Sequence, residues 1–191
     1  MAKSYKKPIY NNIQFASDVE VEYYKLLQNK VLNNEIKFFE YSVDKFIVIP
    51  SFVDFKGRKF KETTYTIDFK ITLNNDEIIY VDTKGGTARQ HDPKEIVKLN
   101  LIRHQNPNIK VYWISKTPVY MGSKWVETTP YYDFLNKLRT RYKKNFPDTY
   151  MLRGKKKPKY LEWNNDFNFK NIDGLFYVWE KTKIIKKSKK K

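Results

Sequence analysis

The order of apolar and polar positions predicts a helix near the start of the chain. Ser17 is followed three residues later by Glu20, the spacing of a capping box, in which the two residues satisfy amides at a helix N-terminus. We expect the helix to run to about residue 32. At 100° per residue, three further apolar residues share one stripe with Glu20: Tyr24, Leu27 and Val31. A carboxylate on an apolar stripe is costly to bury without a partner.

After residue 33 the periodicity changes from that of a helix to that of strands. Strands are expected at 37–41, 45–50, 52–55, 63–73 and 77–82, with turns at 56–58 and 74–76. In the longest of these runs the apolar positions alternate with polar ones, and Asp68 lies on the less apolar face. The runs 63–73 and 77–82 flank a short turn, so we expect them to form a hairpin that ends at Gly85 and Gly86.

The rest of the chain adds helices and one more strand. Asp92 can cap a helix over 92–105 with Pro93 at its first position. A strand is expected at 109–115 and a last helix over 129–145. The order helix, strands, helix, strand predicts an α/β fold in which helices flank a mixed central sheet. We expect a core over 1–120 and a basic, aromatic-rich extension over 121–191.

Composition limits the classes of function that fit this chain. Its 191 residues, 40% of them hydrophobic, suit one core with an appendage. The chain has no cysteine and two histidines, His91 and His104, so a catalytic metal would need oxygen ligands. The first ten residues lack the apolar stretch of a signal peptide, and no run of about 18 apolar residues follows. We expect a soluble protein of the cytoplasm.

The positive charge is concentrated at the C-terminal end. The formal net charge is +17, and residues 137–191, with 18 basic and 5 acidic side chains, contribute +13 of it. The densest internal cluster is Arg153, Lys155, Lys156, Lys157 and Lys159. Lysine and arginine bind polyanions by neutralising phosphates and releasing counterions, so DNA is the expected partner of this cluster. The alternative is a solvated tail that serves solubility.

Acidic and basic residues of the expected hairpin form the candidate catalytic site. Asp68 and Asp82 lie 14 residues apart on its two strands and can converge at one end of the sheet to hold Mg²⁺. Lys84 projects to the same face as Asp82, because strand side chains repeat every second residue. The carbonyl of Thr83 is a further possible ligand, and Glu20 would add a third acid. Such a site can hydrolyse a phosphodiester.

At these residues the chain resembles the PD-(D/E)xK nuclease superfamily, and most closely its small phage-encoded members and Holliday-junction resolvases. The matching residues are Phe15, Ser17 and Glu20 opening a helix, Tyr65 and Asp68 on a strand, Asp82, Lys84 and Gly85 on the next strand, and Lys98 on the following helix. The resemblance covers residues 10–117. Two departures are Ile67 in place of the proline and Asp82 where many members have glutamate.

The resemblance implies a restriction-endonuclease-like core and a metal-dependent endodeoxyribonuclease that uses Mg²⁺, with Mn²⁺ as a substitute. Glu20, Asp68, Asp82, Lys84 and Lys98 would then be the catalytic set. The small size and basic surface suit cutting of branched or junction DNA in the host cell, and cutting two strands would suit a homodimer. Two alternatives stay open: a nucleic-acid-binding protein on the same fold without catalysis, and a ribosome-associated or RNA-binding protein. Glu20 also has a purely structural interpretation as a capping residue, and Lys98 has one as a solvated residue.

Overall fold

The computed structural model describes residues 6–85, 93–117, 122–128 and 169–179, with the single positions 133, 137 and 140. The chain divides into two compact units, Met1–Lys116 and Thr117–Lys191. The predicted helix over 129–145 lies outside the described residues apart from the three single positions, as do Asp92 and Gly86. The basic cluster at 153–159 lies outside them too.

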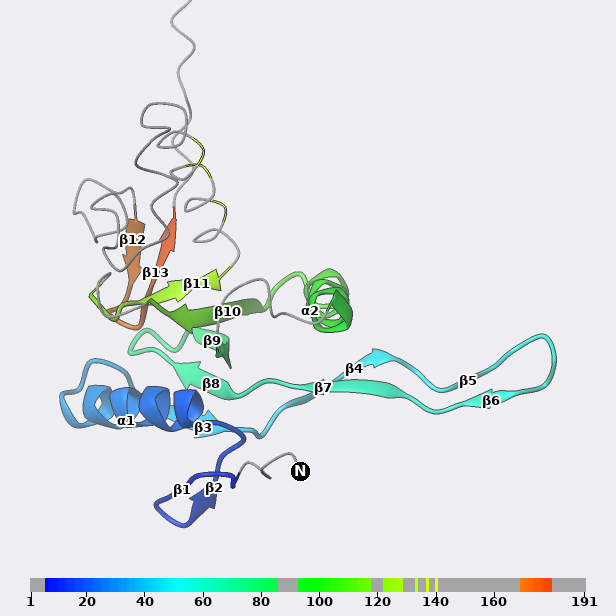
Figure 1. The fold of residues 1–191 in the computed structure, drawn as a ribbon, viewed down its shortest axis with the longest axis horizontal. Coiled ribbons are helices and arrows are strands. Elements are labelled where there is room, and N and C mark those ends of the chain that lie inside the picture. The colour runs from blue at the N-terminus through cyan, green and yellow to red at the C-terminus, as the bar shows by residue number, and fades with distance from the viewer. Residues whose placement is uncertain are drawn as a thin grey trace, which may run out of the picture. The chain divides into compact units, whose positions relative to one another are not determined.

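A mixed sheet forms the centre of the first unit (Figure 1). Its strands, in spatial order, are β10 (Lys110–Lys116), β9 (Ile78–Lys84), β8 (Phe69–Thr72) and β3 (Phe38–Tyr41). β9 runs parallel to β10 and antiparallel to β8, and β8 runs antiparallel to β3. The β8–β9 hairpin predicted from the sequence is confirmed, with Phe69 opposite Val81. The mixed α/β fold class is likewise confirmed.

The helix α1 (Asp18–Leu32) packs on one face of this sheet. Ser17 is its N-cap, as predicted, and the Ser17 hydroxyl accepts from the Glu20 amide at 3.3 Å. The fully buried Tyr23 packs edge-on against Phe69 of β8, with ring centroids 5.3 Å apart. The buried residues of α1 are Glu20, Tyr23 and Leu27, so Glu20 and Leu27 of the predicted stripe are buried. Tyr24 and Val31 are half-buried, and Tyr23, which the pattern did not include, is buried.

The helix α2 (Pro93–Gln105) packs on the opposite face and begins at Pro93 as predicted. The hydrophobic core on this face comprises Val48, Tyr65, Ile67, Leu99, Ile102, Val111 and Trp113. The guanidinium of Arg103 donates to the Val111 carbonyl of β10, which ties the helix to the sheet. Strand alternation turns Val111 and Trp113 toward α2, and turns Ile114 away from it. Among the described residues, one helix therefore covers each face of the sheet.

The run 63–73 is two strands, which corrects the single strand predicted from its alternation. β7 (Thr63–Thr66) pairs with β4 (Lys45–Ile49), whereas β8 pairs with β3 and β9. The chain changes ladders at Ile67 and Asp68, where the carbonyl of Asp68 accepts from the Ser42 amide at 2.7 Å. The alternation of buried residues continues across the break, so the pattern gave no sign of it.

β4 and β7 continue outward as a two-stranded arm, residues 45–66, that projects from the body of the first unit (Figure 1). Its outer ladder pairs β5 (Phe52–Val53) with β6 (Lys59–Phe60) around the predicted turn at 56–58. Gly57 supplies the positive φ of that turn, at 76°. The base of the arm is tied to α2, because the Gln105 side chain donates to the Val48 carbonyl at 3.0 Å.

The remaining described elements were not predicted. A small hairpin of β1 (Ile9–Tyr10) and β2 (Ile13–Gln14) precedes α1. In the second unit, β13 (Phe176–Trp179) pairs antiparallel with β12 (Phe169–Ile172) and parallel with β11 (Trp125–Glu127). Among the described residues, no helix has the length and apolar character needed to cross a membrane.

Candidate active site

Asp82 and Lys84 of β9 form a buried ion pair on the α2 face of the sheet. The Lys84 Nζ lies 2.6 Å from Asp82 Oδ2, and the two side chains are 16% (Lys84) and 3% (Asp82) exposed. The Tyr65 hydroxyl donates to the same oxygen at 3.0 Å and accepts from Lys84 at 3.1 Å. Burial opposes the charge on Lys84, but Asp82 and Tyr65 together outweigh it and raise the pKa of the ammonium. Lys84 is therefore a permanent positive charge in this site.

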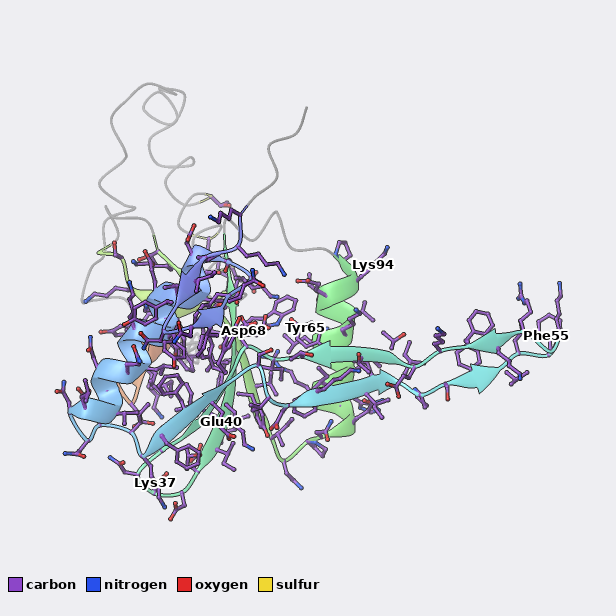
Figure 2. The ribbon with its side chains drawn as sticks, turned by 90° about the horizontal axis from the view of Figure 1, so that it is seen from below. Lys37, Glu40, Phe55, Tyr65, Asp68 and Lys94 are labelled. Atoms are coloured by element: carbon purple, nitrogen blue, oxygen red, sulfur yellow. The ribbon has the colours of Figure 1, made fainter. Side chains whose placement is uncertain are left out.

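Asp68 lies where the chain leaves β7 and enters β8, and it is held by the neighbouring strand. Its Oδ2 accepts from the amide and from the hydroxyl of Thr83, both at 2.8 Å. The Thr83 carbonyl, expected from the sequence as a further possible metal ligand, stays a prediction. The amide and hydroxyl of Thr83 orient Asp68. Figure 2 shows Asp68 and Tyr65 between α1 and α2.

The acidic side chains of the site repel one another. Burial, together with the negative charges of Asp82 and Glu20, raises the pKa of Asp68 well above its usual range, although the Thr83 hydrogen bonds oppose this. Burial also raises the pKa of Asp82, against the opposing effect of Lys84. A further positive charge beside these two carboxylates would lower both pKa values.

Glu20 reaches the site from α1, on the other face of the sheet. Its side chain accepts from the Ala16 amide at 3.0 Å, from the Ser17 hydroxyl at 2.8 Å and from the Tyr41 hydroxyl at 2.6 Å. These bonds involve both carboxylate oxygens, and the residue is only 6% exposed. Glu20 is thus a capping residue and a member of the acidic cluster at once, so the two interpretations of this residue are compatible.

Helix α2 contributes an acid to the site. The Lys84 Nζ lies 3.1 Å from a carboxylate oxygen of Glu95, which the sequence analysis did not single out. Lys98, the residue expected to face the site from this helix, is half-buried and forms no ion pair with a carboxylate of the described residues. Glu95 precedes Lys98 by three residues, so the predicted helix face was close to the contacting one.

Several aromatic residues that the sequence analysis did not assign to the site shape its walls. The Trp113 ring lies 4.9 Å from the Lys84 Nζ, and Trp113 stands opposite Asp82 in the parallel ladder. Tyr41 packs between Phe15 and Phe69, which positions its hydroxyl on Glu20. The register of β3 on β8 could have indicated that Tyr41 lies near the site, because Tyr41 is opposite Phe69, the residue after Asp68. Phe15 of the sequence motif is fully buried, and its role is packing.

The donor set of this site suits a divalent cation held by few protein ligands. In the part of the chain that the structure describes, no three acidic or histidine side chains are grouped closely enough to form a metal site by themselves. The hydrogen bonds among the described residues use Oδ2 of Asp68 and Oδ2 of Asp82, and leave each Oδ1 available. Mg²⁺ typically takes one or two carboxylates and completes its shell with water and substrate phosphate. Asp68 and Asp82 fit that requirement.

The structure therefore gathers four of the five expected catalytic residues, namely Glu20, Asp68, Asp82 and Lys84, around the end of the β8–β9 hairpin. Two carboxylates with raised pKa values stand beside a permanently charged lysine, a combination typical of functional sites. Such a site can bind a phosphate group through the lysine and through a cation on the carboxylates.

Comparison with known proteins places the chain in a family. The chain matches no curated protein and no solved structure. A protein-family model described as "Protein of unknown function (DUF1064)" matches residues 2–122, well over half of the chain. The match covers α1, the arm and the β8–β9 site, and ends before the basic C-terminal residues. The chain belongs to the DUF1064 family.

Proposed function

We propose that this protein is a Mg²⁺-dependent endonuclease that hydrolyses DNA phosphodiesters, with branched or junction DNA as its substrate. The observation that carries the proposal is the meeting of Asp68, Asp82 and Lys84 at one end of the β8–β9 hairpin, with Lys84 ion-paired to the buried Asp82. The resemblance of these residues to the PD-(D/E)xK nucleases supports it. The resemblance implies that the two acids and the lysine share one end of two adjacent strands, and the antiparallel pairing of β8 with β9 supports this.

Each residue of the site has a role in this proposal. Asp68 and Asp82 hold the cation, and Thr83 and Tyr65 fix the orientation of those two carboxylates. Lys84 supplies a positive charge that attracts the scissile phosphate and stabilises the charge that develops on it. Glu20 adds negative potential from the other face of the sheet. When bound, the cation supplies a Lewis acid and lowers the pKa of a coordinated water.

The choice of substrate rests on electrostatics. The acidic cluster is compact, while the chain as a whole carries +17, most of it on residues 137–191. A polyanion is attracted to such a chain over long distances, and the cation and Lys84 offset the repulsion between the acids and a phosphate. DNA with a branch suits a protein of this size better than a long specific sequence. A homodimer would place one such site on each of two DNA strands.

The test is cleavage of supercoiled plasmid, linear duplex and a four-way junction in Mg²⁺, Mn²⁺, Ca²⁺ or EDTA. We expect cutting in Mg²⁺ and Mn²⁺, fastest on the junction, and none in EDTA. Asp82→Asn should abolish cutting while the protein still binds DNA, because the substitution removes a ligand and also a repulsive charge. Asp76→Asn is the matched control, since Asp76 is 71% exposed and pairs with Lys37 away from the site.

Two results would contradict the proposal. If the intact protein binds DNA in every metal and cuts none of the substrates, it is a binding protein on this fold. If Asp82→Asn cuts as fast as Asp76→Asn, the nuclease activity comes from elsewhere. If an RNA duplex added to the assay is cut, or is bound in preference to the DNA substrates, the alternative of a ribosome-associated or RNA-binding protein is favoured.

A further inference from the structure

The outer half of the arm is exposed on all sides. Of residues 49–62, every one is exposed except Asp54, although five of them are large and apolar: Ile49, Phe52, Val53, Phe55 and Phe60. Phe55, at the tip, is 90% exposed (Figure 2). Contiguous exposed apolar residues in a folded protein usually mark an interaction surface.

The arm keeps a definite shape without a hydrophobic core of its own. The rings of Phe52 and Phe60 stack across the two strands, with centroids 4.7 Å apart and planes within 6°. Asp54 closes the turn, because its Oδ1 accepts from the amides of Lys56 and Arg58 at 2.9 Å. A two-stranded ribbon that buries nothing is marginally stable in water. These local bonds therefore preorganise a surface that gains its stability on binding a partner.

The charge of the arm indicates the chemistry of that partner. Arg58 is neutralised by Asp54, with a guanidinium nitrogen 2.6 Å from Oδ2. The other cations around the tip, Lys56, Lys59 and Lys61, have no ion pair within the described residues. The Lys56 Nζ lies 5.4 Å from the centroid of the Phe55 ring. Aromatic rings interleaved with free lysines are typical of surfaces that bind nucleic acid by stacking on bases and neutralising phosphates.

The dimensions of the arm also suit DNA. A two-stranded β-ribbon fits the major groove of B-DNA, which is about 12 Å wide. At about 3.3 Å per residue, the seven residues from Ile49 to Phe55 reach roughly 20 Å, more than the depth of the groove. In continuous duplex, however, the bases are stacked on one another, and an aromatic side chain must separate them to stack. At a branch point unstacked bases are available.

We propose that the arm is a DNA-binding element that recognises a discontinuity in the duplex. Phe55 stacks on an unstacked base, and Lys56, Lys59 and Lys61 contact the flanking phosphates. This inference deepens the proposed nuclease function and rests on it for the nature of the substrate. The other partner that the exposed apolar residues could bind is the arm of a second copy of the chain. Pairing two arms would, however, bring together three unpaired lysines from each, and these like charges would repel.

The test is DNA binding in EDTA, measured by fluorescence anisotropy on a four-way junction and on a continuous duplex of equal length. Phe55→Ala should weaken binding to the junction by roughly 5- to 150-fold, the range for loss of one stacked base, and change binding to the duplex much less. Leu32→Ala is the matched control, because Leu32 is 77% exposed at the end of α1. Circular dichroism should show both variants folded, since neither side chain is buried.

The three lysines of the tip are tested together. Replacing Lys56, Lys59 and Lys61 by glutamine should weaken binding to both DNAs. It should also make the slope of log affinity against log salt shallower by about 0.9 for each phosphate that the variant no longer neutralises. The charge-matched control replaces three exposed lysines of the body, each already ion-paired: Lys37, Lys110 and Lys116.

The arm proposal is overturned if Phe55→Ala binds the junction as tightly as Leu32→Ala does, or if the triple variant keeps the wild-type slope. It is also overturned if the arm variants bind DNA normally but convert a dimer into a monomer in analytical ultracentrifugation. The nuclease proposal can fail on its own. If the intact protein cuts none of the substrates and Phe55→Ala still weakens binding to the junction, the nuclease proposal is refuted and the arm proposal stands.

Discussion

Replacing Lys84 with methionine tests whether the site is built on a buried charge pair. Methionine keeps the unbranched stem that packs near Trp113 and removes the ammonium. Asp82, only 3% exposed, is then left with the Tyr65 hydroxyl and no neutralising charge. Glu95 loses a partner too, but its side chain is 42% exposed and water can solvate it. The cost of the substitution therefore arises mainly at Asp82.

The structure sets the size of that cost. Two unit charges 2.6 Å apart attract by about 6 kcal/mol at an effective dielectric constant of about 20, before desolvation is counted. Removing one partner of a buried pair costs about 3–5 kcal/mol, because the other charge stays buried and unpaired. We expect the free energy of unfolding of Lys84→Met to fall by about 3 kcal/mol at pH 8.

The cost should depend on pH, with a sign that follows from the pKa of Asp82. Burial already raises this pKa, and Lys84 opposes the rise, so removing Lys84 raises it further. An acid with a raised pKa in the folded state contributes stability at low pH that is lost as the pH rises through that pKa. The deficit of Lys84→Met relative to wild type should therefore grow as the pH rises above about 4, the ordinary pKa of an aspartate, by at most about 1.4 kcal/mol per pH unit.

The measurement is urea unfolding in EDTA from pH 5 to pH 8, followed by tryptophan fluorescence. Lys84→Met combined with Asp82→Asn removes the unpaired charge, and we expect the double variant to recover most of the stability lost at pH 8. A deficit that is the same at every pH, or one that Asp82→Asn does not relieve, would refute the idea that a buried charge is the cause.

Three further expectations concern the acid, the cap and the basic extension. Asp68→Asn keeps an oxygen for the Thr83 hydrogen bonds and removes a carboxylate with a raised pKa, so it should raise the melting temperature in EDTA at pH 8. It should also slow cleavage by about 100-fold or more. An unchanged melting temperature would contradict the repulsion between the acidic side chains. Ser17→Ala removes the N-cap and should cost about 1 kcal/mol in urea unfolding, with a smaller loss of cleavage rate than Asp82→Asn shows. Replacing the basic residues of the 153–159 cluster by alanine should make the salt dependence of duplex binding shallower, by about 0.9 for each of a few phosphates, and more than deletion of Lys186–Lys191 does; an unchanged slope would return this cluster to a role in solubility.

Local chemistry made much of the site predictable. Ser17 and Glu20 specify the start of α1 by a capping box, a signal contained within four residues. The hairpin that carries Asp82 follows from alternation on both sides of a short turn. Side chains two apart on a strand share a face whatever the rest of the fold does, so the neighbourhood of Asp82 and Lys84 needed no tertiary information.

Features that depend on partner strands could not be read in this way. Residues 63–73 alternate without interruption, and only the pairing of β7 with β4 and of β8 with β9 divides them. The contact between Glu95 and Lys84 depends on how α2 is rotated on the sheet, and one residue's shift along a helix turns the contacting face by about 100°. The exposure of the arm was hidden too, because its β-prone, apolar residues are the composition of a buried strand.

The separation of the two ladders gives the molecule a modular construction. Register in the arm is set by β4 and β7, and register at the acids is set by β8 and β9, with the crossing at Ile67 and Asp68. Cross-strand pairs can therefore be added to the arm or taken from it without sliding Phe69 away from Val81. An outer arm (residues 49–62) of another length or sequence could be grafted onto the same hairpin while Tyr65, which bonds to Asp82 and Lys84, keeps its place.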